Sequence, residues 1–333
     1  MKKRWFLPVA GLLLAVAPVF LSNFILTLLA QAAVLAVFAA SYDVLLGYTG
    51  IFSFGHALFL GVGAYLTALF LLGGHSLLLA IPAAVVAAAA LAAVIGAVTL
   101  RTKGVYYAMV TLAFAEMFHI YAGMARITGG DNGLTGIPVP SVMATPAGSY
   151  YVMLVFAIVC FGAMYFFLES PPGRVLRAVR DNATRAAMVG YNVPLYLVAA
   201  QVAAAVFASL AGVFLALNQG MVYTDVLSSN TTVNALLMVI LGGIGTLFGA
   251  AIGALMVVVL GGILANYFTY WPLFLGAFYI LFVLLYPQGL MQVNVRRLAN
   301  GLSLFSSRWA RPSGGRKRPG VIIPGGGQGD HER

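Results

Sequence analysis

Residues 24–46 read FILTLLAQAAVLAVFAASYDVLL, and Asp43 is the single charged side chain in this stretch. A helix of about 20 mostly apolar residues is long enough to cross the hydrocarbon core of a bilayer. The pattern extends further, because residues 5–100 carry no other formal charge and residues 186–295 carry only Asp225. Charged residues make up 8% of the 333-residue chain, against roughly 25% in soluble domains. The sequence therefore predicts an all-α polytopic membrane protein.

The same length criterion predicts spanning helices along most of the chain. The expected spans are residues 5–21, 24–46, 51–72, 77–99, 105–124, 148–168, 193–217 and 268–286. Residues 232–265 are too long for one span and short for two, and Gly242, Gly243 and Gly245 offer the one plausible turn. Two crossings there give about ten transmembrane helices. The apolar run after Lys2–Arg4 also resembles a secretory signal, but the many later spans favour an uncleaved first helix.

The placement of Lys and Arg favours ten crossings over nine. Cytoplasmic loops carry an excess of these residues. With the N-terminus inside, ten crossings leave Arg126 as the only external residue among the 18 Lys and Arg. Nine crossings would instead export every basic residue from Arg296 onward. We therefore expect a multi-pass protein with both termini in the cytoplasm.

Two domains are expected from this topology. Residues 1–295 form a transmembrane domain with a cytoplasmic loop at 169–192 and a long external loop at about 125–147. Residues 296–333 form a basic tail rich in Gly and Pro, which cannot bury a core and is expected to be disordered in the cytoplasm. The basic residues lie in short clusters between apolar runs, a pattern typical of membrane topology and not of nucleic-acid binding.

Motifs that would indicate an enzyme are missing from the sequence. It contains no phosphate-binding G-x-x-x-x-G-K-[ST] loop, no H-E-x-x-H and no G-x-S-x-G. The single cysteine, Cys160, excludes a Cys-cluster metal site, and only Glu116 and His119 share a helix face at i, i+3. We therefore expect no catalytic residue, no metal site and no cofactor bound by this chain.

Two acidic residues inside the expected spans require an explanation. An ionised side chain at mid-membrane costs about 2.5–3.5 kcal/mol on insertion scales. Asp43 and Glu116 could bind protons or sodium together with Asp225, which would make the chain an ion-coupled secondary transporter. Alternatively, Asp43 lies near the cytoplasmic end of its span and reaches water or a helix N-terminus, while Glu116 pairs with His119.

Glycines gather at two junctions between expected spans. One group runs from Gly47 to Gly63, and the other from Gly242 to Gly253. Gly245, Gly249 and Gly253 form two successive G-x-x-x-G steps, a pattern typical of close helix packing. A Gly-interrupted segment in each half of the chain is also compatible with an inverted repeat whose broken helices flank a translocation path.

The cytoplasmic loop is predicted to form one amphipathic helix. Ser170 can cap it, Pro171 suits its first position and Gly190 can end it. Apolar residues recur at helical spacing between them, while the basic residues fall largely on other faces. Such a helix either rests on anionic headgroups or docks on a soluble partner.

Five motifs, in order along residues 43–290, resemble those of the LivM-type permease subunit of branched-chain amino acid ATP-binding-cassette importers. They are GYTGIFSFGHA (47–57), GGDNGLTGIP (129–138), the coupling loop between Gly173 and Val193, LGGIG (241–245) and YPQGL (286–290). The external GGDNGLTGIP motif favours LivM over its LivH paralogue. Arg185 departs from the wider importer class, which favours Glu before the following pair of alanines.

The resemblance implies a transmembrane permease domain that alternates access while separate subunits hydrolyse ATP. Its partners would be a LivH-like second permease, two ATP-binding cassette subunits that hold ATP and magnesium, and a periplasmic or lipid-anchored substrate-binding protein. The location would be the bacterial plasma (inner) membrane. The cargo would be a branched-chain amino acid or a related small polar solute.

Site residues are expected where the sequence matches these motifs and at polar positions in neighbouring spans. The ATPase-coupling residues would be Arg177, Arg180, Asp181, Asn182, Ala186, Ala187 and Gly190. The translocation path would involve Ser53, Phe54, Gly55, His56, Thr111, Glu116 and Asn234. The contacts with the binding protein would be Gly130, Asp131, Asn132, Gly133 and Thr135.

Overall fold

The computed structural model describes residues 18, 21–99, 102, 104–286 and 289–292. The chain divides into two units, residues 1–292 and 293–333, and all described residues belong to the first. The predicted first span at 5–21, apart from residues 18 and 21, and the predicted basic tail at 296–333 lie outside the described residues. The predicted boundary between the two domains therefore stays a prediction.

Helices account for most of the described residues, which confirms the predicted all-α polytopic fold. Six of them are long and apolar enough to cross a membrane: α2 (Asn23–Thr49), α4 (Leu77–Thr99), α5 (Val105–Met124), α6 (Pro146–Glu169), α9 (Val193–Gln219) and α11 (Leu247–Tyr267). Three shorter apolar helices are α3 (Ala57–Leu72), α10 (Ser229–Gly242) and α12 (Trp271–Leu285).

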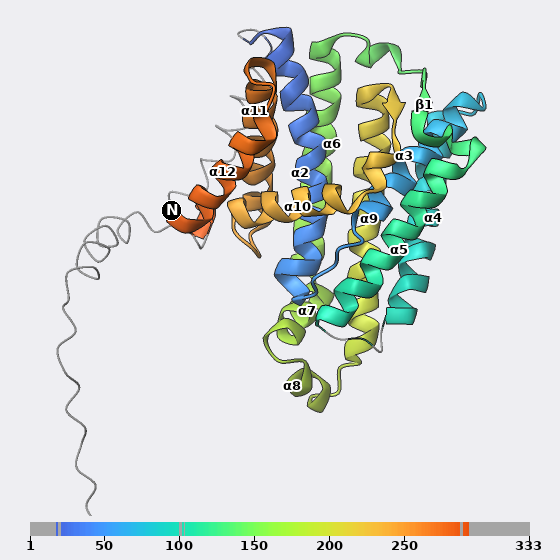
Figure 1. Ribbon diagram of the computed structural model, residues 1–333. Coiled ribbons are helices and arrows are strands. Elements are labelled where there is room, and N and C mark those ends of the chain that lie inside the picture. Colours follow the sequence, from blue (N-terminus) through green and yellow to red (C-terminus); the bar gives the residue numbers. More distant parts are fainter. Residues whose placement is uncertain (1–17, 19–20, 100–101, 103, 287–288, 293–333) are drawn as a thin grey trace, which may run out of the picture. The chain divides into compact units, whose positions relative to one another are not determined.

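Short elements connect these helices. The two helices of the loop between α6 and α9 are α7 (Pro171–Asp181) and α8 (Ala183–Met188). The 3₁₀ turns are η1 (Arg126–Thr128), η2 (Gly130–Asn132), η3 (Ser141–Met143), η4 (Thr224–Leu227) and η5 (Leu290–Gln292). The strands β1 (Leu134–Thr135) and β2 (Met221–Val222) pair antiparallel, with Leu134 opposite Val222. Figure 1 shows β1 at the opposite end of the bundle from α7 and α8.

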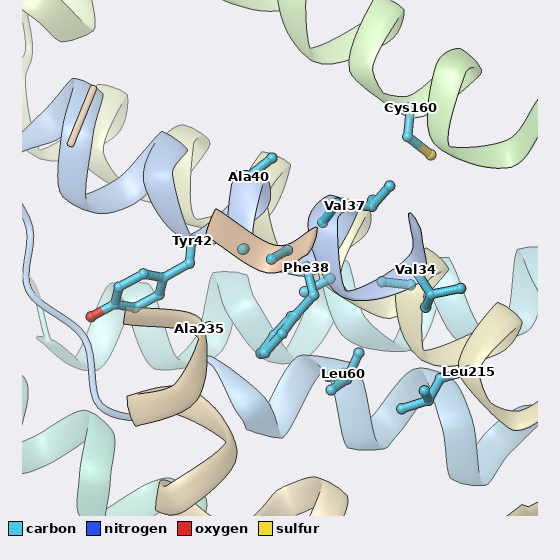
Figure 2. Packing of buried hydrophobic residues seen from close by; sticks show 14 of the residues in the cluster. Val34, Val37, Phe38, Ala40, Tyr42, Leu60, Cys160, Leu215 and Ala235 are labelled. Atoms are coloured by element: carbon cyan, nitrogen blue, oxygen red, sulfur yellow. The ribbon is translucent and has the colours of Figure 1, made fainter. Parts of the chain in front are cut away.

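Helix α2 lies at the centre of the bundle and packs against α6, α9, α10 and α11. Its side chains are buried along most of its length, and Figure 2 shows Val34, Val37 and Phe38 beside Leu60 of α3 and Leu215 of α9. A helix that is buried on all faces must be apolar all round. This explains why residues 24–46 show no polar stripe.

Helices α3 and α9 approach each other through glycines. A Cβ atom at Gly63 would lie 2.8 Å from the Cα of Ser209, and one at Gly212 would lie 2.9 Å from the Ala64 nitrogen. Without a side chain at these positions, the two backbones can pack closely, as is common between membrane helices. The Ser209 hydroxyl also donates a 3.1 Å hydrogen bond to the Ala84 carbonyl, which ties α9 to α4.

Two of the ten predicted crossings are not continuous helices. The expected span 51–72 is helical only from Ala57, and the residues before it form an irregular, non-helical segment (Figure 1). Helix α10 has only 14 residues and lies across α2 instead of along it (Figure 1). The Ala57 N–H donates a 3.0 Å hydrogen bond to Thr232 Oγ1, so the first turns of α3 and α10 meet inside the bundle.

Candidate functional site

The loop at residues 169–192 folds as two helices, so the prediction of one helix up to Gly190 was wrong. Asn182 has an extended backbone, with φ −163° and ψ 98°, and it separates α7 from α8. Its Oδ1 accepts a 2.8 Å hydrogen bond from the Arg185 N–H, as an N-cap residue does. The preference of Asn for the N-cap position therefore ends α7 and starts a new helix, although the apolar residues continue at helical spacing.

One side of this helix pair packs on the bundle. Val175, Val179 and Ala186 are buried and contact Tyr196 and Leu197 at the start of α9. The predicted coupling residues Asp181, Asn182, Ala187 and Gly190 are all exposed. The structure therefore presents most of the predicted coupling residues at the surface but buries Ala186.

Two exposed apolar residues at the end of α8 were not predicted. The exposed fraction is 82% for Met188 and 73% for Val189. Large apolar side chains this exposed outside a spanning helix are typical of a docking surface when they lie together. The sequence signal was available, because both residues directly precede Gly190 in a loop expected to be cytoplasmic.

Arg177 anchors α7 to the ends of α6 and α2. Its guanidinium donates to Glu169 Oε1 at 2.7 Å and to the Leu168 carbonyl at 3.1 Å, both at the end of α6. It also lies 5.4 Å from the ring centroid of Tyr48, which is a cation–π contact with α2. Because the Arg177 side chain remains 40% exposed, its predicted role at the ATPase interface stays a prediction.

Arg180 also reaches the bundle, from the next turn of α7. Although the residue as a whole is exposed, its guanidinium donates a hydrogen bond to the Gly47 carbonyl near the end of α2. Asp43, one turn earlier in α2, is fully buried, and its Oδ1 accepts a 2.8 Å hydrogen bond from the Gly245 N–H. Asp43 thus binds a backbone N–H of the α10–α11 loop.

Five residues of the predicted translocation path lie close together, and all of them except the partly buried Phe54 are buried. The Phe54 N–H donates to Thr111 Oγ1 at 3.3 Å, and a Cβ at Gly55 would lie 2.9 Å from the Thr111 carbonyl carbon. Ser53 is buried as well. His56 Nε2 lies 2.8 Å from Ser41 Oγ, and its ring stacks on Phe38 with centroids 5.4 Å apart. A solute can reach these groups only if the packed elements around them move.

The other two predicted path residues lie outside this group. Glu116 is partly exposed on α5 and Asn234 is exposed on α10, and in the described part of the chain neither forms a hydrogen bond with the buried residues. The expected pairing of Glu116 with His119 is also not formed. His119 Nδ1 instead lies 2.9 Å from the Thr224 carbonyl of η4.

The predicted binding-protein contacts form a defined platform at the end of the bundle opposite α7. Asp131, Asn132 and Thr135 are exposed there. Gly133 has φ 66° and ψ −166°, and a Cβ at this position would lie 3.0 Å from the Tyr223 Cα. The β1–β2 pair and this close approach fix the exposed residues on a rigid base. Gly130 precedes them at the first position of η2.

Only two of the three predicted packing glycines lie on one helix. A Cβ at Gly249 would lie 2.6 Å from the Gly242 carbonyl oxygen, and one at Gly253 would lie 3.1 Å from the Gly242 nitrogen. Both therefore allow α11 to pack closely against α10. Gly245 precedes α11 in the loop and has φ 78°, a left-handed conformation that favours glycine.

The acidic residues do not form an ion site with each other. Asp43 binds Gly245, while Asp225 Oδ1 accepts a 3.1 Å hydrogen bond from Ser228 Oγ. Across the described ranges, no group of three or more His, Cys, Asp or Glu side chains could hold a metal ion. This arrangement does not favour the alternative of an ion-coupled transporter.

Comparison with known proteins identifies the relatives of this chain. A family model described as the permease component of the branched-chain amino acid transport system matches residues 24–285. The chain is 27% identical over 323 residues to the high-affinity branched-chain amino acid transport system permease protein LivM of Escherichia coli (strain K12) and to that of Salmonella typhimurium (strain LT2). Each alignment covers 88% of this chain and 76% of the relative. No solved structure matches the chain significantly.

Proposed function

The chain belongs to the permease family of the branched-chain amino acid transport system, and we propose that it is the LivM-type membrane subunit of an importer driven by ATP hydrolysis on separate subunits. The observation that carries this proposal is the family match over residues 24–285, which spans the coupling loop and both glycine-rich junctions. The cargo would be a branched-chain amino acid or a related small polar solute, as the names of the relatives suggest.

We propose that the exposed end of the α7–α8 pair binds the ATPase subunits. Met188 and Val189 of this pair are exposed, as are Asp181 and Asn182 a few residues earlier in the chain. Apolar anchors within a polar rim are typical of protein interfaces. Two ATP-binding cassette subunits, holding ATP and magnesium, would deliver movement here.

At the opposite end, we propose that the exposed residues of η2 and β1 contact a substrate-binding protein. Asp131, Asn132 and Thr135 offer hydrogen-bonding groups on a backbone fixed by the β1–β2 pair. A rigid platform loses little conformational entropy on binding, which favours docking. This end would face the periplasm, and the α7–α8 end the cytoplasm.

A second, LivH-like permease would complete the passage. In a single chain Glu116 of α5 is partly exposed and Asn234 of α10 is exposed, although both belong to apolar helices. Polar side chains in membrane helices usually face a protein interior or a water-filled cavity. A second permease placed against α5 and α10 would enclose them, and rocking of the two subunits would alternately expose the path to each side.

The function is tested by purifying the tagged chain from its host and reconstituting what is recovered into proteoliposomes. We expect the second permease and both ATPase subunits to be recovered with it, and leucine uptake to require ATP and the binding protein. Recovery of a lone homo-oligomer, or uptake driven by an ion gradient without ATP, would contradict the proposal. Competition by urea and other small amides would then define the cargo.

A further inference from the structure

Three segments that are distant in the sequence meet at the C-terminal end of α2. They are the helix end itself, the α10–α11 loop at residues 243–246 and helix α7. The buried Asp43 carboxylate accepts the Gly245 N–H at 2.8 Å, and in the described chain its second oxygen has no hydrogen-bond partner. In the described chain, the hydrogen bond to Gly245 is therefore the one that holds the Asp43 carboxylate.

The loop fits closely onto α2 because of glycines on both sides. A Cβ at Gly47 would lie 2.5 Å from the Gly245 nitrogen and 2.6 Å from its Cα, closer than real Cβ atoms approach. Gly243 and Gly245 have φ values of 111° and 78°, which L-amino acids with side chains rarely adopt. The loop and the helix end are therefore in direct backbone contact.

Arg180 joins α7 to the same place. The Gly47 carbonyl is one of the last four in α2, which lack an intrahelical donor, and the guanidinium of Arg180 supplies one. A positive charge at a helix C-terminus is also favourable with respect to the helix dipole. Its Nη1 lies 3.1 Å from the position of a Cβ at Gly245, and the guanidinium attracts the Asp43 carboxylate electrostatically.

The far end of α10 reaches the interior of the bundle. Thr232, in its first turn, accepts a hydrogen bond from the Ala57 N–H at the start of α3. The residue before Ala57 is the buried His56, and the chain leading to it packs on Thr111. Helix α10 therefore connects the Arg180 attachment with the predicted translocation path.

We propose that Arg180 and Asp43 are positioning residues that link the coupling helix α7 to α10, so that displacement of α7 by the ATPase subunits shifts α10 and the start of α3. This inference rests on the proposed function. Discrete arrangements of packed helices can transmit such a movement, because close-packed backbones shift together and not independently. Arg180 thus acts on the inner side of α7, opposite to the surface that meets a partner.

The test uses the complete complex in proteoliposomes and measures leucine uptake and ATP hydrolysis in the same preparation. Arg180→Ala is expected to assemble with the ATPase subunits and to lower the uptake per ATP hydrolysed about tenfold, within the usual range of coupling between sites. Arg180→Lys, which keeps a charged donor, should recover part of the loss. The matched control is Arg174→Ala, since Arg174 is exposed on the same helix and its side chain makes no hydrogen bond to any described residue.

Asp43→Leu removes the acceptor for Gly245 and is expected to lower the same ratio. The double variant Arg180→Ala, Asp43→Leu should show an uptake per ATP no lower than that of the more impaired single variant, because both substitutions break the same link between α7 and α10. If Asp43→Leu does not accumulate, the Arg180 series decides alone. An unchanged ratio in Arg180→Ala, or loss of the ATPase subunits from it, would overturn the linkage. Wild-type complex that lacks ATP-dependent uptake would instead refute the proposed function.

Discussion

Replacing Gly253 by Ala is expected to disturb the packing of α11 against α10. The new Cβ would lie 2.8 Å from the Met238 carbonyl carbon and 3.1 Å from the Gly242 nitrogen, and closer still to the Met238 carbonyl oxygen. All three are backbone atoms of α10, so rotation of a side chain cannot relieve the contact. Overpacking costs about 1–3 kcal/mol, from which the better helix propensity of Ala subtracts roughly 0.5–1 kcal/mol. We expect a net loss of about 1–2 kcal/mol.

Gly162→Ala in α6 is the matched control. A Cβ at Gly162 would have no atom of another element within 4 Å, so the propensity gain is expected without any clash. The two variants are compared by unfolding the purified proteins in detergent micelles. The helical circular-dichroism signal is measured during titration with a denaturing detergent. Gly253→Ala should unfold at a lower midpoint than wild type, and Gly162→Ala at the same or a higher one. Equal midpoints for the two variants would refute the close backbone contact between α10 and α11.

Three further changes test separate parts of the molecule. Met188→Asp places a charge on the exposed end of α8 and should prevent recovery of the ATPase subunits while the chain itself accumulates normally, which affinity purification from membranes measures. Gly133→Ala requires a backbone conformation that costs about 1–3 kcal/mol for Ala, and it should weaken uptake that depends on the binding protein without changing basal ATP hydrolysis. Thr111→Val leaves the Phe54 N–H without its acceptor and should destabilise the chain by about 1–3 kcal/mol. Thr111→Ser keeps the hydroxyl and should unfold like wild type in the same titration.

The long helices could be predicted because hydrophobic length alone decides whether a segment spans a membrane. The expected span 77–99 coincides with α4, and the expected 24–46 differs from α2 by only a few residues at each end. The irregular segment before Ala57 was predicted as helix because it carries no charge and continues into an apolar run, and hydropathy does not report backbone conformation. The same limitation hid the crosswise path of α10, since only tertiary contacts fix the direction of a short apolar helix.

The exposed residues of the candidate site could be predicted from the sequence, but the buried contacts of Asp43 and Arg180 could not, and this difference has a physical reason. Exposure of Asp181 and Asn182 follows from local amphipathic spacing, which the sequence contains. The hydrogen-bond partners of Asp43 and Arg180 could not be predicted from local spacing. Gly245 lies 202 residues after Asp43, and Gly47 lies 133 residues before Arg180. Both partners are backbone groups, so no complementary side chain in the sequence indicated them.

The contrast between buried and exposed polar residues bears on how the passage is built. Ser53, His56 and Thr111 are buried inside one chain. The hydrogen bonds of His56 and Thr111 join α2 and α5 to the chain leading into α3. Glu116 is partly exposed and Asn234 is exposed, yet both lie in apolar helices. Leaving an ionised side chain against lipid costs about 2.5–3.5 kcal/mol at mid-helix. The second permease that we propose against α5 and α10 would cover the exposed part of Glu116 and so remove this cost.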